Sequence, residues 1–269
     1  MKFSLLMCVY KNDDPAHFHT SLDSVFHSSV LPDEIILVVD GPIGIELNRV
    51  IDLFKARINL KDIRLMYNVG LGKALSHGIE YCNNEVVARF DSDDVCHPLR
   101  FERQLKYMAD NECIDVVGSW VAEFDLEPTS VHAYRNTPTS HNEIIKYAKL
   151  RNPFNHMSVM FKKTKVLSAG GYQDDYLYED YSLWVRMITN GCIMKNIPEV
   201  LVYARTGNGM EMRRGGYRYL ESEISGQFKF YKLGFLSKRE LLVNLLIRVP
   251  VRIFPGNLRK SIYRNLLRK

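Results

Sequence analysis

The chain has 269 residues, 46% of them hydrophobic and 25% charged, which is the composition of a globular protein with a substantial core. No apolar run reaches the roughly eighteen residues that a membrane-spanning helix needs. The formal net charge of +5 belongs to the end of the chain, because residues 236–269 contain nine Lys or Arg and one Glu. The rest therefore has no general basic face, and we expect no nucleic-acid partner.

The first 120 residues alternate between continuous apolar runs and amphipathic patterns. The apolar runs predict strands over residues 2–9, 34–39, 63–67, 86–90 and 115–120. The amphipathic patterns predict helices over residues 15–26, 45–57, 70–82 and 98–111. Strands that are apolar throughout and alternate with helices predict an α/β fold whose parallel sheet is covered on both faces.

After residue 120 the alternation weakens, and residues 121–152 resist assignment. A strand over 158–161, a helix over 181–189 and short strands over 193–195 and 201–203 are expected beyond them. We therefore divide the chain into a first half (1–120), a second half of the same domain (121–235) and a basic tail (236–269).

The strand expected at residues 86–90 ends in three closely spaced carboxylates, Asp91, Asp93 and Asp94. Like charges at this density repel, and oxygen ligands suit a hard divalent cation, Mg²⁺ or Mn²⁺, that bridges phosphate oxygens. The alternative is a solvated acidic turn that caps a helix. Placement at the carboxyl end of a parallel strand, where open α/β folds bind ligands, favours the cation.

Two further strand ends carry candidate donor-binding groups. Asp40 follows the second strand and either hydrogen-bonds a base or a ribose, or forms an ordinary Asp-Gly turn. The segment Asn68-Val69-Gly70-Leu71-Gly72-Lys73 brings backbone and an amine toward a possible phosphate. It matches neither glycine-rich nucleotide motif, so an ordinary glycine-rich turn is the favoured interpretation of this segment taken alone.

The second half offers an acid pair, a histidine and a basic segment. Glu179 and Asp180 either cap the next helix or supply a general base, and Trp184 lies among aromatic residues that suit a sugar ring. His156 precedes a strand, where a structural role is favoured over binding because no second partner is evident. Arg205 and the pair Arg213-Arg214 flank a glycine-studded loop, and either clamp a diphosphate or are simply solvated.

The tail alternates apolar and basic residues in two helical stripes. Leu241, Leu242, Leu245, Leu246 and Val249 form the first, which we expect to pack on the main domain, and Pro250 and Pro255-Gly256 interrupt it. Leu258, Ile262, Tyr263, Leu266 and Leu267 form the second, interleaved with Lys and Arg. Helices of this kind lie on anionic bilayers, so we expect the second stripe to contact a membrane.

The series of motifs resembles the family 2 inverting glycosyltransferases of the GT-A fold, over about residues 1 to 210. It comprises Val9-Tyr10-x-Asn12, Val38-Val39-Asp40-Gly41, Asn68-x-Gly70-x-Gly72-Lys73, and Ala88-Arg89-Phe90-Asp91-Ser92-Asp93-Asp94 followed by Pro98 and Arg100. The resemblance implies a Rossmann-like, nucleotide-binding mixed sheet flanked by helices, with the first half binding a UDP-sugar and the second carrying acceptor and catalytic groups.

The resemblance also implies residue roles. Asp40 would contact the base, Asp91 the ribose or metal, Asp93 the metal, and Asp180 would be the catalytic base. The further candidates for donor binding are Tyr10, Asn12, Asn68, Gly70, Lys73 and Ser92, which lie in the matched motifs, together with Arg205 and Arg213. The candidates for acceptor binding are Glu179, from the matched acid pair, and His156 and Trp184. The Gln-x-x-Arg-Trp motif of processive members is absent, which predicts transfer of one sugar per encounter.

Residues 205–216 resemble transferases of the amylovoran and colanic acid type, which build bacterial O-antigen and exopolysaccharide. That likeness implies a polyprenyl-diphosphate-linked acceptor and attachment to the inner face of the plasma membrane. Five widely spaced cysteines without a Cys-x-x-Cys pair agree with a cytoplasmic protein. The alternative enzyme is a sugar-nucleotide pyrophosphorylase, but Asn12-Asp13-Asp14-Pro15 stands where that class would want a glycine- and arginine-rich loop. A glycoside hydrolase or a membrane adaptor explains fewer of the motifs.

Overall fold

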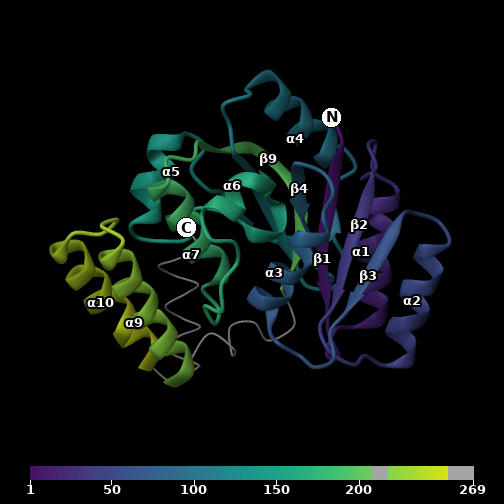
Figure 1. Ribbon diagram of the computed structural model, residues 1–269, viewed down its shortest axis with the longest axis horizontal. Helices are drawn as coiled ribbons and strands as arrows, with labels where there is room; N and C mark the ends of the chain where they lie inside the picture. The colour runs from purple at the N-terminus through teal and green to yellow at the C-terminus, as the bar shows by residue number, and fades with distance from the viewer. Residues whose placement is uncertain (207–216, 254–269) are drawn as a thin grey trace.

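The computed structural model describes residues 1–206 and 217–253, the side chains as far as residue 250. Within these ranges nine strands form one sheet, in the order β3-β2-β1-β4-β8-β6-β9-β5, with β7 paired to β6 (Figure 1). The first four strands pair in parallel. Their bounds are β1 Phe3–Val9, β2 Glu34–Val39, β3 Leu60–Arg64 and β4 Val86–Arg89.

The second half adds antiparallel strands, so the sheet is mixed. β8 (Met160–Lys162) runs antiparallel to both β4 and β6 (Val116–Phe124). β9 (Met194–Arg205) pairs in parallel with β6, while β5 (Val95–Cys96) and β7 (Val131–Arg135) pair antiparallel with β9 and β6. The sheet therefore differs from the all-parallel arrangement expected from the first half, and agrees with the mixed sheet of the GT-A fold.

Helices cover both faces of the sheet. One face packs on α1 (Pro15–Phe26), α2 (Ile45–Lys55) and α4 (Arg100–Asp110), and the other on α3 (Leu71–Tyr81), α5 (His141–Ala148), α6 (Lys163–Ser168) and α7 (Glu179–Thr189). A short 3₁₀ turn, His156–Ser158, precedes β8. Strands β1 and β2 are almost wholly buried, as expected for strands with apolar side chains on both faces.

Two antiparallel helices complete the described chain at one end of the molecule (Figure 1). α9 (Tyr217–Lys232) and α10 (Lys238–Ile253) pack on each other, and α9 also packs on α7. Phe230, Phe235 and Leu236 join Tyr178 and Tyr181 in a third apolar cluster. The first part of the expected tail is thus integrated into the fold through Leu241, which is buried. The expectation that the whole first stripe packs on the main domain was wrong for Leu242 and Leu246, which lie on the other side of α10 and are exposed.

The structure corrects several expected boundaries. Residues 194–205 form one strand rather than two, because pairing with β6 shifts register around Trp120 and leaves Pro198 and Glu199 without partners. β3 begins at Leu60, three residues before the expected start. The expectation that Pro250 interrupts the tail helix was wrong, because α10 runs through it to Ile253. The second tail stripe lies outside the described residues.

No helix in the described ranges has the length and apolar character needed to cross a bilayer.

Candidate active site

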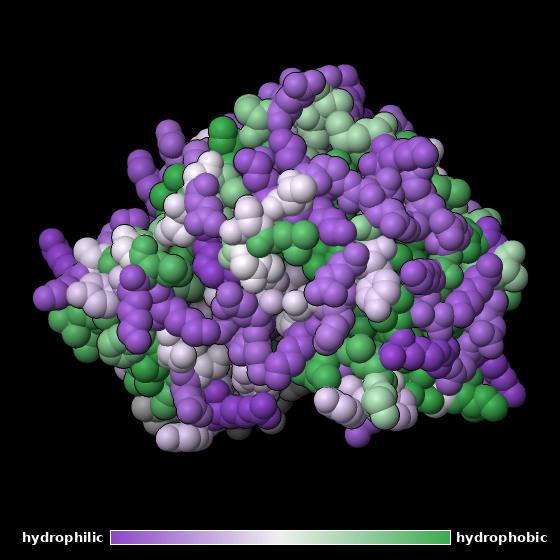
Figure 2. All heavy atoms as spheres, viewed as in Figure 1, coloured by the Kyte–Doolittle hydropathy of each residue, from purple (hydrophilic) through white to green (hydrophobic). Residues whose placement is uncertain are grey.

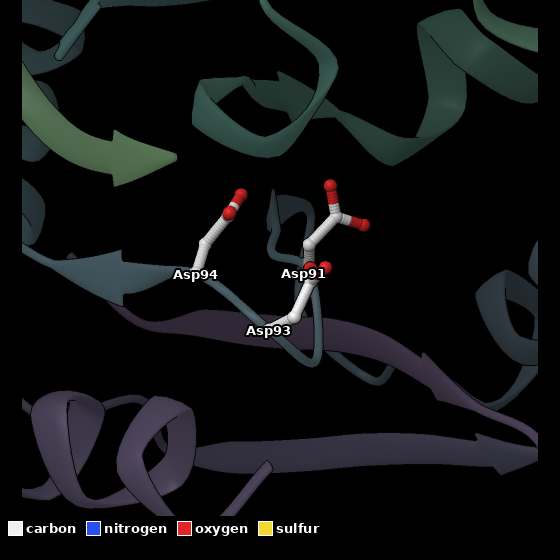
Figure 3. A group of neighbouring side chains, drawn as sticks. All are labelled: Asp91, Asp93 and Asp94. Carbon is white, nitrogen blue, oxygen red and sulfur yellow. The ribbon is translucent and has the colours of Figure 1, made fainter. Parts of the chain in front are cut away.

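The acidic cluster forms at the carboxyl end of β4. Carboxylate oxygens of Asp91, Asp93 and Asp94 all lie within 4.8 Å of one another, and the three side chains project from the same side of the turn (Figure 3). Burial, together with the charges of Asp91 and Asp13, raises the pKa of Asp93 to about 7. Burial and the charges of Asp93 and Asp91 raise the pKa of Asp94 well above its usual range. The cluster is therefore electrostatically unfavourable without a cation.

The donor set fits a hard divalent cation. Asp94 is 2% exposed; its Oδ1 accepts a hydrogen bond from the Arg205 backbone N–H at 2.8 Å, while its buried Oδ2 has no protein partner among the described residues. A buried carboxylate oxygen without a partner is costly, and a metal ion is a partner of the required charge and hardness.

Arg89, the last residue of β4, is a buried cation whose place in the site was not predicted from the sequence. It is 2% exposed and pairs with Asp91, while its Nε and Nη1 are buried without protein partners in the described structure. Burial and the charge of Asp180 raise the pKa of Glu179, and the charge of Arg89 offsets part of that rise, so Arg89 acts on both groups of acids. The sequence feature that could have indicated its role is that Arg89 is the one charged residue in an otherwise apolar strand.

Asp13 is a second residue whose place in the site was not predicted from the sequence. Its Oδ2 accepts hydrogen bonds from the Tyr10 backbone N–H and the Ser92 hydroxyl, both at 3.0 Å. Asp13 therefore joins the predicted residues Tyr10 and Ser92 to the acidic cluster. Asn12, by contrast, is exposed beside it.

Asp40 shapes the glycine-rich loop. Its carboxylate accepts hydrogen bonds from the backbone N–H groups of Val69 and Gly70, at 2.7 and 3.0 Å, and from the Asn68 amide at 2.9 Å. Gly70 has a φ of 88°, a conformation that favours glycine. These contacts give Asp40 a structural role in holding the 68–70 loop, and its contact with a nucleotide base stays a prediction.

Lys73 and Gly72 tie this loop to the segment that precedes the second acid pair. Lys73 Nζ lies 2.6 Å from the carboxylate of Asp174. A Cβ on Gly72 would overlap the carbonyl oxygen of Gln173, so only glycine allows α3 to approach so closely. The structure gives Lys73 an acidic partner, and contact with phosphate stays a prediction.

Glu179 and Asp180 form the first turn of α7, where carboxylates complement the helix dipole. The Asp180 carboxylate is oriented by two hydrogen bonds, from the Asn152 amide at 2.6 Å and from the Tyr181 N–H at 2.7 Å. Burial and the neighbouring charge of Asp180 raise the pKa of Glu179 to about 7. Sequence analysis did not identify Asn152.

Trp184 belongs to the core, so its expected contact with the acceptor was wrong. It is 0% exposed and packs on Phe154 and Phe161, because it lies one helical turn after Asp180 on the sheet-facing side of α7. The favoured structural role of His156 agrees with its contacts. Its Nε2 lies 2.9 Å from the Tyr172 hydroxyl, and burial beside Arg89 lowers its pKa well below the usual range.

Arg205 ends β9 instead of lying in a loop, and its guanidinium has protein partners. Nε donates to the Asp93 carbonyl at 3.1 Å, Nη1 donates to the Leu126 carbonyl at 2.9 Å, and the group stacks on Phe124. Through these contacts Arg205 holds the acidic turn in place. Arg213 lies outside the described residues.

Comparison with known proteins identifies the family. The model of Glycosyl transferase family 2 matches residues 4–168. This chain belongs to that family. The glycosyltransferase is 41% identical over 268 residues to the UDP-Gal:alpha-D-GlcNAc-diphosphoundecaprenol beta-1,3-galactosyltransferase of Escherichia coli, covering 100% of this chain and 97% of that protein. It is 37% identical over 265 residues to the amylovoran biosynthesis glycosyltransferase AmsE of Erwinia amylovora, covering 97% of each.

Solved structures confirm the fold of the glycosyltransferase. It superposes on S. aureus TarS 1-349 in complex with UDP-GlcNAc with a TM-score of 0.70 at 15% identity, covering 99% of this chain and 76% of that one. The mannosyltransferase PcManGT from Pyrobaculum calidifontis, in complex with GDP-Man and Mn2+, gives 0.66 at 14% identity, covering 98% and 80%. Both are GT-A-like neighbours, as the motif series predicted.

Proposed function

We propose that this glycosyltransferase moves one sugar, with inversion, from a UDP-sugar to a saccharide on a polyprenyl diphosphate, in the synthesis of bacterial O-antigen or exopolysaccharide. The printed names of two relatives that match nearly the whole chain describe a UDP-galactose donor with a lipid diphosphate acceptor, and amylovoran biosynthesis. A UDP-hexose is the donor favoured by the first name. The observation that supports the proposal is the presence of two acid groups, one at the end of β4 and one at the start of α7, with buried Arg89 paired with Asp91 of the first and electrostatically coupled to Glu179 of the second.

Donor binding is assigned to the first group. Asp91, Asp93 and Asp94 would hold Mn²⁺ or Mg²⁺, which when bound neutralises charge on the diphosphate leaving group. Tyr10, Ser92 and the loop at Asn68–Lys73 are assigned to the nucleotide, since they line the same strand ends. Arg89 compensates the charge of Asp91 and leaves two N–H groups for donation.

Catalysis is assigned to Asp180. The carboxylate removes the proton from the acceptor hydroxyl as the oxygen attacks the anomeric carbon, the bond to the diphosphate breaks, and UDP leaves. The hydrogen bonds from Asn152 and Tyr181 fix the orientation of the base. Glu179 beside it keeps the local potential negative, which favours proton uptake by the pair.

We assign membrane contact to the outer face of α10 and the basic residues that follow it. Leu242, Val243, Leu246 and Ile247 form one stripe and are 40 to 66% exposed, and apolar side chains gather at that end of the surface in Figure 2. Leu241 and Asn244, on the opposite side of the helix, are buried. An exposed apolar stripe beside basic residues suits an anionic bilayer, where a lipid-linked acceptor resides.

The test is transfer of radiolabelled sugar from UDP-galactose, UDP-glucose and the two UDP-N-acetylhexosamines to a synthetic N-acetylglucosaminyl diphosphate lipid. We expect one product with a single added sugar, formed with Mn²⁺ or Mg²⁺ and abolished by EDTA. Donor consumption without a lipid product, or undiminished transfer in EDTA, would contradict the acceptor and metal assignments respectively.

A further inference from the structure

Two segments adjoin the proposed base, the residue that precedes the acid pair and the loop after α5. Tyr178 immediately precedes the acid pair and forms the N-cap of α7. Asn152, from the loop after α5, donates to Asp180 Oδ2 at 2.6 Å. The position of the Asp180 carboxylate therefore depends on both Tyr178 and the 149–152 segment.

Helix α10 holds both of these segments. Arg248 Nη1 donates to the Tyr178 hydroxyl at 3.0 Å and to the Glu223 carboxylate, while Nη2 donates to the Leu150 carbonyl. Asn244, one turn earlier, donates to the Lys149 carbonyl at 2.7 Å and to Gln227 at 2.8 Å. One face of α10 thus contacts both the backbone of residues 149–150 and the side chain of Tyr178.

The contacts around Tyr178 are closely packed and buried. Tyr178 is 4% exposed and Glu223 0% exposed, and the Tyr178 hydroxyl donates to Glu223. A Cβ on Gly226 of α9 would meet the Tyr178 ring at 2.6 Å. Leu177, just before, has a φ of 58°, which a non-glycine residue keeps only where neighbouring contacts enforce it.

We propose that Arg248 is a positioning residue for the transfer reaction, acting on Asp180 through Tyr178 and Leu150. This inference rests on the proposed role of Asp180 as base. The contacts of Arg248 among the described residues are with Tyr178, Glu223, Leu150 and the Tyr181 ring, none of which is assigned to the donor. Its loss should therefore slow the chemical step and leave nucleotide binding unchanged. The same helix carries the exposed stripe assigned to the bilayer, so the membrane-facing element is also the one that fixes the base.

The test compares variants that remove the Arg248 contacts with variants that keep them. Arg248→Met combined with Glu223→Gln removes the guanidinium without leaving a buried charge unpaired, and Gln still bonds the Tyr178 hydroxyl. Arg248→Lys keeps the charge but loses the two-pronged geometry. The matched control is Arg239→Met, which replaces an exposed arginine near the start of the same helix and leaves the contacts with Tyr178 and the 149–152 segment in place. Folding is checked by thermal melting, and UDP binding by calorimetry.

We expect the double variant to lower kcat by at least about tenfold, as misplacement of a catalytic group does, with donor KM and UDP affinity within twofold of wild type. Arg248→Lys should be intermediate and Arg239→Met near wild type. A folded double variant with wild-type kcat, or an equal loss in Arg239→Met, would overturn the inference. Asp180→Asn is measured alongside: if it stays active, the proposed base is wrong, whereas an inactive Asp180→Asn with fully active Arg248 variants refutes the positioning role alone.

Discussion

Replacing Glu179 with Gln should stabilise the protein at alkaline pH, because ionised Glu179 is held beside Asp180 in a half-buried site. The pKa of Glu179 is raised from 4.5 to about 7, which at 1.36 kcal/mol for each pH unit amounts to about 3 kcal/mol. Solvent screening of a partly exposed group reduces this, and we expect a gain of about 1–2 kcal/mol in the free energy of unfolding.

The sign of the pH dependence follows from the raised pKa. Below pH 4.5 the carboxyl is protonated in both folded and unfolded chains, so Glu179→Gln should have little effect there. As pH rises from 4.5 through 7 the wild-type protein loses stability that the Gln variant retains. The pH–rate profile should change too, because without the neighbouring charge the acid limb of kcat moves to lower pH.

Urea denaturation at pH 5 and pH 8 measures the effect, with Glu127→Gln as the control for loss of an exposed carboxylate. We expect the stability difference between variant and wild type to appear at pH 8 and to shrink at pH 5, while the control changes at neither. A Glu179→Gln variant that is destabilised at pH 8, or equally stabilised at both, would refute the electrostatic reasoning.

Three further outcomes are expected. Gly72→Ala forces a Cβ against the Gln173 carbonyl, and it should cost about 1–3 kcal/mol of unfolding free energy and reduce kcat. The control Gly44→Ala has open space around the added Cβ and should cost under about 1 kcal/mol. Equal losses in the two variants would contradict the close approach of α3 to Gln173. Asp94→Asn should raise the melting temperature in EDTA by removing a buried like charge, yet weaken Mn²⁺ binding by at least about tenfold; unchanged Mn²⁺ affinity would remove Asp94 from the metal site. Leu242→Glu with Leu246→Glu should abolish sedimentation with anionic vesicles and spare donor hydrolysis, and retained binding would count against the α10 face.

The donor half was predictable because its pattern is local. Strands that are buried on both faces have continuous apolar sequences, which identify them. The carboxyl ends of parallel strands lie at the same edge of the sheet, so the strand assignment alone places Asp40 and Asp91 at that edge. β3 was misplaced because it is an edge strand: Lys61 is exposed there, so the apolar run that marks the other strands is missing.

The catalytic half was less predictable because its geometry depends on distant segments. Nothing near Asn152 in the sequence indicates that its amide reaches Asp180, and Arg248 meets Leu150 from 98 positions away. The long strand β9 was read as two because Pro198 interrupts the apolar pattern, and the structure accommodates it at a bulge. Pro250 was read as a helix end, yet it lies on the exposed side of α10 near its last turn, where losing one hydrogen bond is tolerated.

The role of Asp180 as catalytic base is tested most directly by Asp180→Asn, with sugar transfer and nucleotide binding measured on the same preparation. Sugar transfer to the lipid acceptor should fall by about 10²-fold or more, while calorimetry with UDP and Mn²⁺ gives the wild-type affinity. Wild-type transfer by the variant, or loss of UDP binding together with transfer, would contradict the assignment of this carboxylate as the base.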